Sequence, residues 1–425
     1  MARTTQGDEP PRSAARHGRL RKSSGWSNLG RVVLTVFLVV GFSGVATAAY
    51  AIWGIVRNTH TVDLGTTDPA AIGAGAQSVE GELTVLLAGS DTRKGQDYDD
   101  GEESELNDVT LLLHISADHQ NATVISFPRD LMVPIPSCPS EDGKENFYPA
   151  MSEQQLNTAL TYGGLPCVVR TIEELTGMAI PYAGLITFNG VVGVSNAVGG
   201  VEVCLTQPIY DEHTNLDLPA GLNTLVGWDA LQFLRTRHGV GDGSDTSRIN
   251  NQQIFMVSLM QKLKSANTLS DPLKVYALAK AGLENMTLSK SMASMKFMQA
   301  AAGTVKDIDL NRINFVQYPS VNHPYQEGRL RPDAFTAKQL IDAVKAGKAI
   351  EVTDPGLVAE QETPEEGGST TPAEDAEGAE GGEETTEAPS DPTTTPGADE
   401  PVKLPPNITG LNSGGVYCSA GRTLF

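Results

Sequence analysis

The chain has 425 residues, with 31 Lys and Arg against 52 Asp and Glu and a formal net charge of −21. Residues 351–400 alone contain 16 Asp and Glu and no Lys or Arg, so the remainder carries a net charge of only about −5. A folded part without a basic patch argues against a nucleic-acid-binding protein, and the acidic, Thr/Pro/Gly-rich composition of 351–402 predicts a disordered linker.

The N-terminal region predicts a single membrane anchor. Residues 1–31 hold seven Lys and Arg and two acids, which we interpret as a cytoplasmic tail. Residues 32–56 carry no charge, and as a helix they would extend about 37 Å, enough to cross a hydrocarbon core of roughly 30 Å. Basic residues before the span place the N-terminus inside the cell and the rest of the chain outside. A cleaved signal peptide ending at Ala46-Thr47-Ala48 is the alternative, but the apolar run continues to Val56 and favours a retained anchor.

One folded domain is expected at 82–350, after a Thr/Ala/Gly-rich stalk at 57–81. Short apolar runs bounded by turn signals predict strands at 83–89, 109–116, 122–127, 182–188, 201–205 and 313–319. Amphipathic patterns predict helices at 153–164, 167–177, 190–199, 246–265, 271–286, 289–303 and 336–347. This order predicts an α/β fold, bordering on α+β, with a single mixed central sheet covered by helices. Residues 403–425, beyond the linker at 351–402, are interpreted as a C-terminal tail.

Four cysteines, Cys138, Cys167, Cys204 and Cys418, lie on the predicted extracellular side, where disulfides persist. Their spacing contains no CxxC motif, which argues against a zinc or redox pair. Three complete pairings are open. We favour Cys138 with Cys167, because both flank loops at the same end of the predicted sheet, and this bond would contribute roughly 3 to 4 kcal/mol.

Charged residues follow the predicted strands at one end of the sheet. Asp91 and Arg93 come directly after the strand at 83–89, and Asp108 opens the next strand at the same end. Open α/β sheets bind ligands at such strand ends, although an aspartate there can also simply cap a turn. Arg129 follows a strand and a proline, before an apolar stretch, so it must be paired or bind an anion. A structural bridge from Arg129 to Asp130 is the alternative.

The stretch "LRTRHGVGDGSDTSRINNQQ" predicts an anion-binding clamp. Arg235 and Arg237 would share a face if they lie on a strand, and Arg248 and Gln252 lie four residues apart on one face of a helix. Convergent arginines suit a phosphate-rich ligand, and nearby carboxylates suit a hard cation that bridges to it. The alternative is a loop of surface salt bridges in which Asp245 caps the helix. No nucleotide P-loop, HExxH or GxSxG motif is present, and the histidines have no metal-ligand spacing.

Six motifs occur in one order, and together they resemble the LytR-CpsA-Psr (LCP) family of bacterial cell-envelope glycopolymer transferases over about 82–316. The motifs are "LLAGSDTR", "NDVTLLLHIS", "VISFPRDLMVPIP", "LNTALTYGG", "NAVGGVEV" and "ALQFLRTRHG…GSDTSRINNQQ". A membrane anchor followed by an extracellular catalytic domain also fits the family. The resemblance implies a Gram-positive, actinobacterial cell envelope.

The resemblance implies that a glycan phosphate moves from an undecaprenyl-pyrophosphate carrier to a peptidoglycan sugar or a surface glycoprotein, with Mg²⁺ or Mn²⁺. Matching the motifs implies three roles. The metal ligands would be Asp91 and Asp108. The groups that bind the pyrophosphate would be Arg129, Arg235, Arg237 and Arg248, with Gln252 adding a hydrogen bond and Arg93 and Asp245 belonging to the same network. The polyprenyl tail would need an apolar groove between the sheet and the helices.

Three departures from the family pattern are visible. Many relatives carry an arginine where this chain has Leu106, the loop at 94–105 is unusually acidic, and the C-terminal tail does not resemble an accessory domain. Two other functions use the same residues. A polyprenyl-pyrophosphate phosphatase would use water as the acceptor, and a non-catalytic wall-binding or regulatory protein would only hold an anionic polymer.

Overall fold

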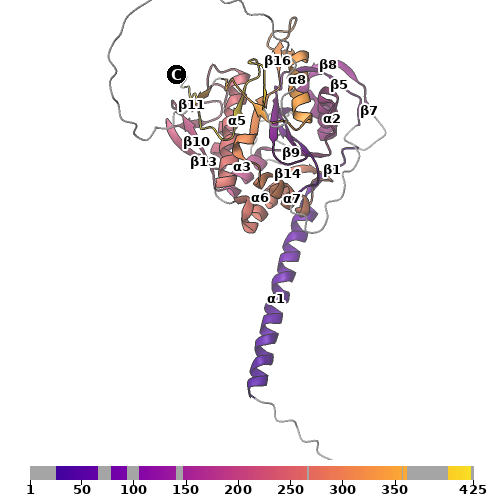
Figure 1. The fold of residues 1–425 in the computed structure, drawn as a ribbon, viewed down its shortest axis with the longest axis vertical. Coiled ribbons are helices and arrows are strands. Elements are labelled where there is room, and N and C mark those ends of the chain that lie inside the picture. The colour runs from indigo at the N-terminus through magenta and orange to yellow at the C-terminus, as the bar shows by residue number, and fades with distance from the viewer. Residues whose placement is uncertain are drawn as a thin grey trace, which may run out of the picture. The chain divides into compact units, whose positions relative to one another are not determined.

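The computed structural model describes residues 25–65, 78–92, 105–139, 147–265, 268–356, 358–360 and 401–422. The chain divides into two compact units, 1–54 and 55–425. The described part of the first unit, 25–54, belongs entirely to helix α1 (Gly25–Asn58) (Figure 1). Within the described residues, no helix has both the length and the apolar character needed to cross a membrane. The predicted span at 32–56 falls partly on side chains outside the described part, namely 45 and 47–56, and it stays a prediction.

An eight-stranded mixed sheet forms the centre of the second unit (Figure 1). Its order is β1 (His60–Val62), β14 (Met286–Ser289), β9 (Tyr182–Ile186), β2 (Leu83–Ser90), β3 (Asn107–Ile115), β4 (Ala122–Phe127), β15 (Ile313–Gln317) and β21 (Gly410–Asn412). The pairs β1–β14, β2–β9 and β4–β15 are parallel and the other pairs are antiparallel. The predicted mixed central sheet is therefore present, and the strand at 122–127 has the predicted bounds.

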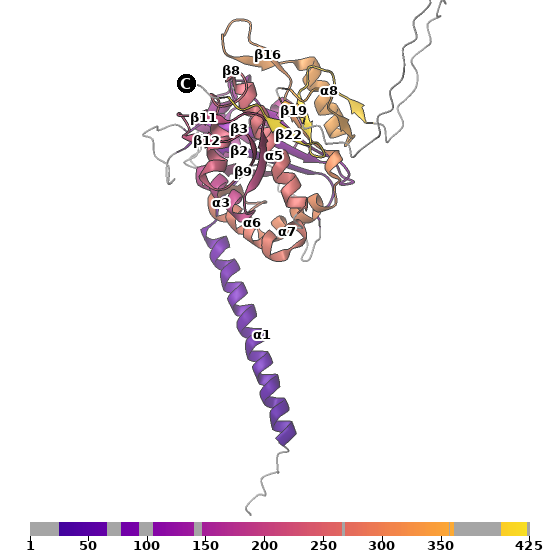
Figure 2. The same cartoon turned by 90° about the vertical axis from the view of Figure 1, so that its left-hand side faces the viewer.

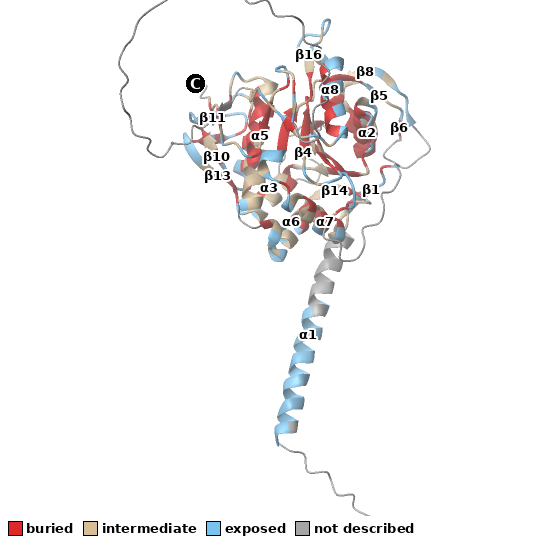
Figure 3. Ribbon diagram, in the orientation of Figure 1, coloured by how far each residue is buried: buried red, intermediate tan, exposed pale blue. Residues whose placement is uncertain are grey.

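Helices cover both faces of this sheet, because its central strands carry apolar side chains on both sides. On β2, Leu86 belongs to the core shared with α2 (Ala159–Thr176) and α8 (Ala334–Lys345). Its neighbour Val85 belongs to the opposite core, which includes residues of α5 (Asp245–Ser265), α6 (Pro272–Asn285) and α7 (Met295–Lys306). The buried residues concentrate on the sheet and on the helix faces that meet it (Figure 3).

The expectation of a single sheet is wrong, because the strand at 201–205 belongs to a second sheet. Four strands form it, in the order β13 (Gly221–Leu225), β10 (Val201–Leu205), β22 (Tyr417–Ser419) and β19 (Val358–Glu360). Short two-stranded sheets complete the architecture: β5 (Met132–Ile135) with β8 (Met151–Gln155), β6 (Cys138–Pro139) with β7 (Phe147–Tyr148), β11 (Ile209–Asp211) with β12 (Leu216–Leu218), β16 (Ser320–Asn322) with β17 (Leu330–Pro332), and β18 (Ile350–Glu351) with β20 (Val402–Lys403). Single turns of 3₁₀ helix lie at Leu156–Thr158, Thr268–Ser270 and Leu310–Arg312.

Helix α2 replaces the two helices predicted at 153–164 and 167–177, and residues 153–155 belong to strand β8 instead. Gly163 and Gly164 break its helical geometry. A Cβ on Gly163 would lie 2.6 Å from the carbonyl oxygen of Pro139 and 2.9 Å from Cβ of Cys138, so only glycine permits this approach. The close approach brings together Cys138 and Cys167, and the structure joins them in the disulfide favoured from the sequence.

The segment interpreted as a tail returns to the folded domain. Residues 410–412 add strand β21 to the edge of the central sheet, and β22 lies between β10 and β19 in the second sheet (Figure 2). A second disulfide joins Cys204 of β10 to Cys418 of β22 across 214 residues of sequence. The backbone N–H of Gly241 donates to the Ala420 carbonyl at 2.8 Å, and that of Arg422 donates to the Gly239 carbonyl at 2.7 Å. Residues 401–422 therefore hold the glycine-rich loop that precedes α5.

Candidate active site

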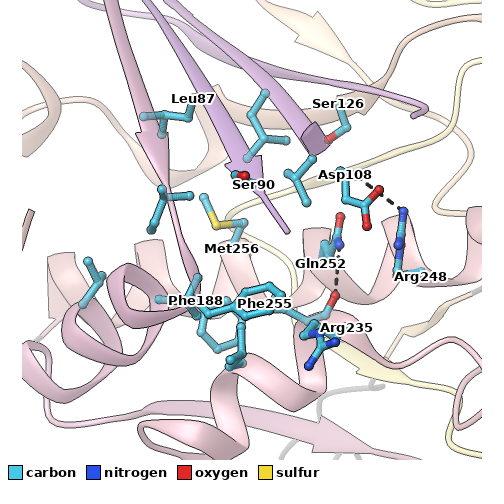
Figure 4. A pocket seen from close by; sticks show the side chains of 18 of the residues that line it. Leu87, Ser90, Asp108, Ser126, Phe188, Arg235, Arg248, Gln252, Phe255 and Met256 are labelled. Atoms are coloured by element: carbon cyan, nitrogen blue, oxygen red, sulfur yellow. Dashed lines mark hydrogen bonds between the residues drawn. The ribbon is translucent and has the colours of Figure 1, made fainter. Parts of the chain in front are cut away.

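A cavity of about 520 Å³ lies beside strands β2 and β3, between the central sheet and helices α3 (Phe188–Ala197), α4 (Trp228–Arg235) and α5. Figure 4 shows that its lining changes character from one part to another. Charged and amide side chains line one part: Asp91, Asp108, Arg129, Arg235, Arg237, Arg248 and Gln252. The structure therefore places seven of the residues predicted for the site around one cavity.

The two aspartates reach this cavity because β2 and β3 are antiparallel neighbours. Ser90 at the end of β2 pairs with Asn107 at the start of β3, so Asp91 and Asp108 lie at the same end of these two neighbouring central strands. Asp91 accepts a hydrogen bond on Oδ1 from the backbone N–H of Leu106 at 2.8 Å, and its own N–H donates to the Leu106 carbonyl at 3.1 Å. These two bonds fix the end of β2 against the start of β3, where the two carboxylates lie.

Arg129 is surrounded by carboxylates at the end of β4. Its Nη1 donates to Oδ1 of Asp108 at 2.9 Å, and its Nε lies 3.3 Å from Asp130 and 3.8 Å from Asp245. Burial lowers the pKa of the Arg129 guanidinium, but the three carboxylates raise this pKa by more. The alternative of a bridge to Asp130 is thus real, but it is one contact of several, and Arg129 also lines the cavity.

Asp245 joins three arginines at the first turn of α5. Its carboxylate lies 2.7 Å from Arg248, 3.5 Å from Arg237 and 3.8 Å from Arg129. The Arg248 side chain is only 6% exposed; its burial lowers the pKa of its guanidinium, although Asp245 opposes this shift. Among the described residues, Nε of Arg248 has no hydrogen-bond partner. A buried cationic donor of this kind costs free energy unless an anion satisfies it.

Arg235 and Arg237 do not lie on a strand, so that expectation is wrong. Residues 228–235 form helix α4, which ends at Arg235, and Thr236 leaves the helical conformation. The cause is the following loop, in which Oγ1 of Thr236 donates to the buried carboxylate of Asp211 at 2.5 Å. The two arginines still line one cavity because the chain turns sharply between them. The guanidinium of Arg235 lies over the ring of Phe188, 4.6 Å from its centroid.

The loop between α4 and α5 is held in one shape by short polar contacts. Asp242 accepts hydrogen bonds from the backbone N–H of Ser244 at 2.9 Å and from the hydroxyl of Ser247 at 2.5 Å. The hydrogen bonds of Ser244 and Ser247 lower the pKa of Asp242 to about 2. Together with the backbone of residues 420–422, these contacts fix the direction in which Arg237 enters the cavity.

The rest of the cavity is lined by apolar side chains (Figure 4). They come from the sheet, from α3 and α4, and from α5: Leu87, Val109, Leu111, Ile186, Phe188, Val191, Val194, Leu231, Leu234, Phe255, Met256 and Leu259 are among them. The apolar groove expected between the sheet and the helices is therefore present, and these are its residues. Sequence periodicity gave the apolar faces of these helices, but it could not show which of them face a cavity.

Comparison with known proteins identifies the family. Residues 56–344 match the family model described as LytR_cpsA_psr. The chain belongs to the LytR_cpsA_psr family. The cell wall biosynthesis protein LcpA of Corynebacterium glutamicum is 29% identical over 290 residues, covering 61% of this chain and 52% of LcpA. The chain thus spans about half the length of this relative.

Two other similar proteins come from Enterococcus faecalis and Streptococcus agalactiae. The polyisoprenyl-teichoic acid–peptidoglycan teichoic acid transferase TagU of Enterococcus faecalis is 28% identical over 240 residues, covering 55% of this chain and 72% of TagU. Protein gbs0355 of Streptococcus agalactiae has a solved structure that superposes with a TM-score of 0.51 at 21% identity, covering 63% of this chain and 88% of that one. This last likeness shows that the LytR_cpsA_psr protein shares a fold with gbs0355.

Two residues of the predicted site of this LytR_cpsA_psr protein need separate comment. Gln252 lines the cavity, but its Nε2 donates to the Leu234 carbonyl at 3.0 Å. In this structure the amide N–H therefore forms a hydrogen bond to the last turn of α4. Its hydrogen bond to a ligand stays a prediction. Arg93 lies outside the described residues, as does most of the acidic loop at 94–105.

The donor set of the LytR_cpsA_psr site is compatible with a hard divalent cation. Within the described residues, no group of three or more His, Cys, Asp and Glu could hold a metal ion. Magnesium, however, needs only one or two protein carboxylates when phosphate and water oxygens supply its other ligands. Asp91 and Asp108, at the same end of strands β2 and β3, fit this requirement. One oxygen of Asp108 also accepts a hydrogen bond from Arg129.

Proposed function

We propose that the chain is a phosphotransferase that moves a glycopolymer from a polyprenyl-pyrophosphate carrier to a cell-wall acceptor. One observation supports this proposal most strongly: arginines and a long apolar lining share one cavity. A polyprenyl pyrophosphate has a highly charged head and an apolar tail, so it needs both surfaces side by side. The teichoic acid transferases among the relatives carry the same type of donor and acceptor in their names.

The chain's residues would act mainly through charge and position. Arg129, Arg237 and Arg248 would bind the pyrophosphate oxygens and offset the charge that develops when the phosphoanhydride bond breaks. The acceptor hydroxyl forms the new bond to the glycan-linked phosphorus as the phosphoanhydride bond to the second phosphate breaks. Polyprenyl phosphate leaves with the bonding electron pair, and the hydroxyl proton passes to this leaving group or to water. A bound Mg²⁺ or Mn²⁺ would neutralise phosphate charge, with Asp91 and Asp108 as its protein ligands.

Phe188 and Arg235 mark the transition between the two parts of the cavity. An arginine stacked on an aromatic ring places its positive charge directly beside an apolar surface. We therefore expect Arg235 to bind the phosphate nearest the lipid, with the first isoprene units beyond Phe188.

The experiment is a transfer assay with a polyprenyl-pyrophosphate glycan and purified peptidoglycan, followed by mass spectrometry of the products. A glycan phosphate linked to peptidoglycan supports the proposal. Release of free glycan phosphate with every acceptor supports the phosphatase alternative, and polymer binding without any bond cleavage supports the non-catalytic alternative. A surface glycoprotein added as acceptor separates that possibility from peptidoglycan.

We also propose that the chain is a single-pass membrane protein, anchored at 32–56 with its catalytic domain outside the cell. Two disulfides in the second unit support an oxidising compartment. Recovery of the chain from washed membranes, with 82–350 open to external protease and 1–31 protected, would agree with this topology. Recovery in a soluble fraction would contradict it.

A further inference from the structure

Asp130, next to the arginine cluster, is bound from three directions. Its Oδ2 lies 3.3 Å from Nε of Arg129, and its Oδ1 accepts from Nε2 of Gln155 at 2.7 Å and from Nη1 of Arg329 at 2.5 Å. The three donors come from separate segments: the end of β4, the end of β8, and the turn between β16 and β17. Neither Gln155 nor Arg329 belongs to a motif, and sequence reasoning missed both.

The backbone around Asp130 is fixed as well, so this is more than a chance surface ion pair. The N–H of Leu330 donates to the Asp130 carbonyl at 3.1 Å, and Leu131 forms a parallel bridge with Leu330. On the other side, the N–H of Asn157 donates to the Arg129 carbonyl at 3.2 Å. The Asp130 side chain is 16% exposed, whereas that of Arg329 is 37% exposed. Asp130 is therefore held in place, with Arg329 reaching it from the outer side.

The contacts of Asp130 decide how it can hold Arg129. A carboxylate with both oxygens free binds a guanidinium through two parallel hydrogen bonds. Such a pair on Arg129 would use Nε and an outer nitrogen, and would withdraw donors from the cavity. Oδ1 of Asp130 already accepts from Gln155 and Arg329, so only Oδ2 is left for Nε of Arg129. Arg129 then keeps outer N–H donors for Asp108 and for a ligand.

We propose that Asp130 and Arg329 are positioning residues for Arg129. Arg329 occupies the second oxygen of Asp130, which limits Asp130 to a single contact and leaves the cavity side of the Arg129 guanidinium open to a phosphate group. The charge of Arg329 acts on the ligand only through Asp130. This inference deepens the proposed function by naming what orients a phosphate-binding arginine, and it depends on that function for turnover but not for anion binding.

The test is a double-mutant cycle on inorganic pyrophosphate binding by the full chain, measured by calorimetry beside turnover and melting temperature. Arg329→Met should weaken pyrophosphate binding about tenfold, whereas Arg331→Met should change it less than about twofold, because screened surface charges have small effects. Arg331 is a matched control two residues away in β17, exposed and without a contact to Asp130 among the described residues. Arg329→Lys, which keeps the charge, should recover binding to within about threefold of the wild type.

The decisive measurement is the same substitution in the Asp130→Asn background. There, Arg329→Met should have no larger effect than Arg331→Met, because the residue through which Arg329 acts has lost its charge. Equal effects in both backgrounds, equal effects of Arg329→Met and Arg331→Met, or no pyrophosphate binding by the wild type would each overturn the inference. A wild type that binds pyrophosphate with the expected coupling but transfers nothing would support the inference and contradict the proposed function.

Discussion

The carboxylate of Asp245 lies 2.7 Å from the guanidinium of Arg248, one turn further along helix α5. Arg248 lines the polar part of the cavity, and Asp245 also lies within 4 Å of Arg129 and Arg237. Asp108 and Asp130 also contact Arg129, and Arg329 contacts Asp130. Three carboxylates therefore face four arginines, namely Arg129, Arg237, Arg248 and Arg329. The cluster therefore keeps a positive excess, which is the condition for binding a pyrophosphate.

Arg237 and Arg248 should differ in what their loss does. Arg237→Ala should lower turnover at least about 30-fold, since a charge-assisted contact is lost, while costing at most about 1 kcal/mol of unfolding free energy because its side chain is 30% exposed. Arg248→Ala should also cost about 1 to 3 kcal/mol of stability, because its side chain is only 6% exposed and fills space beside Asp245, which keeps Arg129 and Arg237 as partners. Denaturant titrations beside turnover of a polyprenyl-pyrophosphate analogue check both. Lys280→Ala, at an exposed ion pair with Glu284, is the control. A near-normal rate in Arg237→Ala would contradict the proposal that Arg237 binds the pyrophosphate.

The metal prediction is tested with asparagine variants. Asp91→Asn and Asp108→Asn keep the size of each side chain and, for Asp91, an oxygen that can accept from Leu106. Each variant should lose the dependence of turnover on Mg²⁺ and at least about 30-fold in rate, with a melting temperature close to that of the wild type. A variant whose stability falls in parallel with its rate would show that its aspartate is structural.

The apolar part of the cavity should make kcat/KM depend on the length of the donor's lipid tail. Val191 of α3 lines it and is half-buried, so Val191→Phe would fill space that a long tail needs. We expect kcat/KM for a long polyprenyl donor to fall about tenfold, and kcat/KM for a two-isoprene donor to change much less. Leu222→Phe on β13, 67% exposed and outside the cavity lining, controls for added bulk. Equal losses for both donors would show that the tail binds elsewhere.

His114 in β3 should make stability depend on pH. Burial lowers the pKa of its imidazole below 6.5, and the ring hydrogen-bonds to the Thr84 hydroxyl at 3.0 Å. Because the unfolded chain then binds the proton more readily, stability is full above about pH 6.5 and falls as the pH drops below it. His114→Asn should remove up to about 1.4 kcal/mol per pH unit of this decline. Denaturant titrations between pH 7.5 and 4.5 give the slopes, and parallel slopes in the two proteins would disprove the assignment.

The two disulfides should differ in their effect on the site. Non-reducing peptide mapping should show Cys138 linked to Cys167 and Cys204 linked to Cys418. Replacing Cys204 and Cys418 by serine should cost about 3 to 5 kcal/mol of stability and also lower turnover, because the glycine-rich loop loses its brace. Replacing Cys138 and Cys167 should cost stability while sparing turnover of the protein that remains folded. Equal turnover losses per folded molecule would contradict a special role for residues 401–422.

Much of the central sheet could be predicted, because β2, β3 and β4 are apolar runs set by local sequence. The residues around the cavity could also be proposed, since Asp91, Asp108 and Arg129 follow or open those strands. The geometry at Arg235 and Arg237 could not be predicted from the sequence. A two-residue spacing fits a strand as well as a helix end, and the choice depends on a buried contact between Thr236 and Asp211, which is remote in sequence.

Long-range partners explain the other omissions. Arg329 lies 199 residues from Asp130, and the return of 401–422 to β10 and β15 follows the 50 residues of acidic sequence at 351–400. No periodicity in either segment indicates what it will pair with. Three complete cysteine pairings were open from the sequence, and the preference for Cys138 with Cys167 rested on their own flanking loops, not on any signal in 403–425 that pointed to Cys204.

The backbone hydrogen bonds from residues 420–422 to the loop before α5 also affect the order in which parts of the domain can fold. The loop that carries Arg237 obtains two of its backbone hydrogen bonds from Ala420 and Arg422, which a ribosome adds only after the rest of the domain has been made. Folding that starts at the N-terminal side can therefore assemble the sheet and the apolar cavity first, while the loop that carries Arg237 is not yet held in place. A nascent chain that lacks residues 420–422 could fold most of its core and still lack a rigid anion site, so we expect the loop that carries Arg237 to become ordered only after these residues have been added.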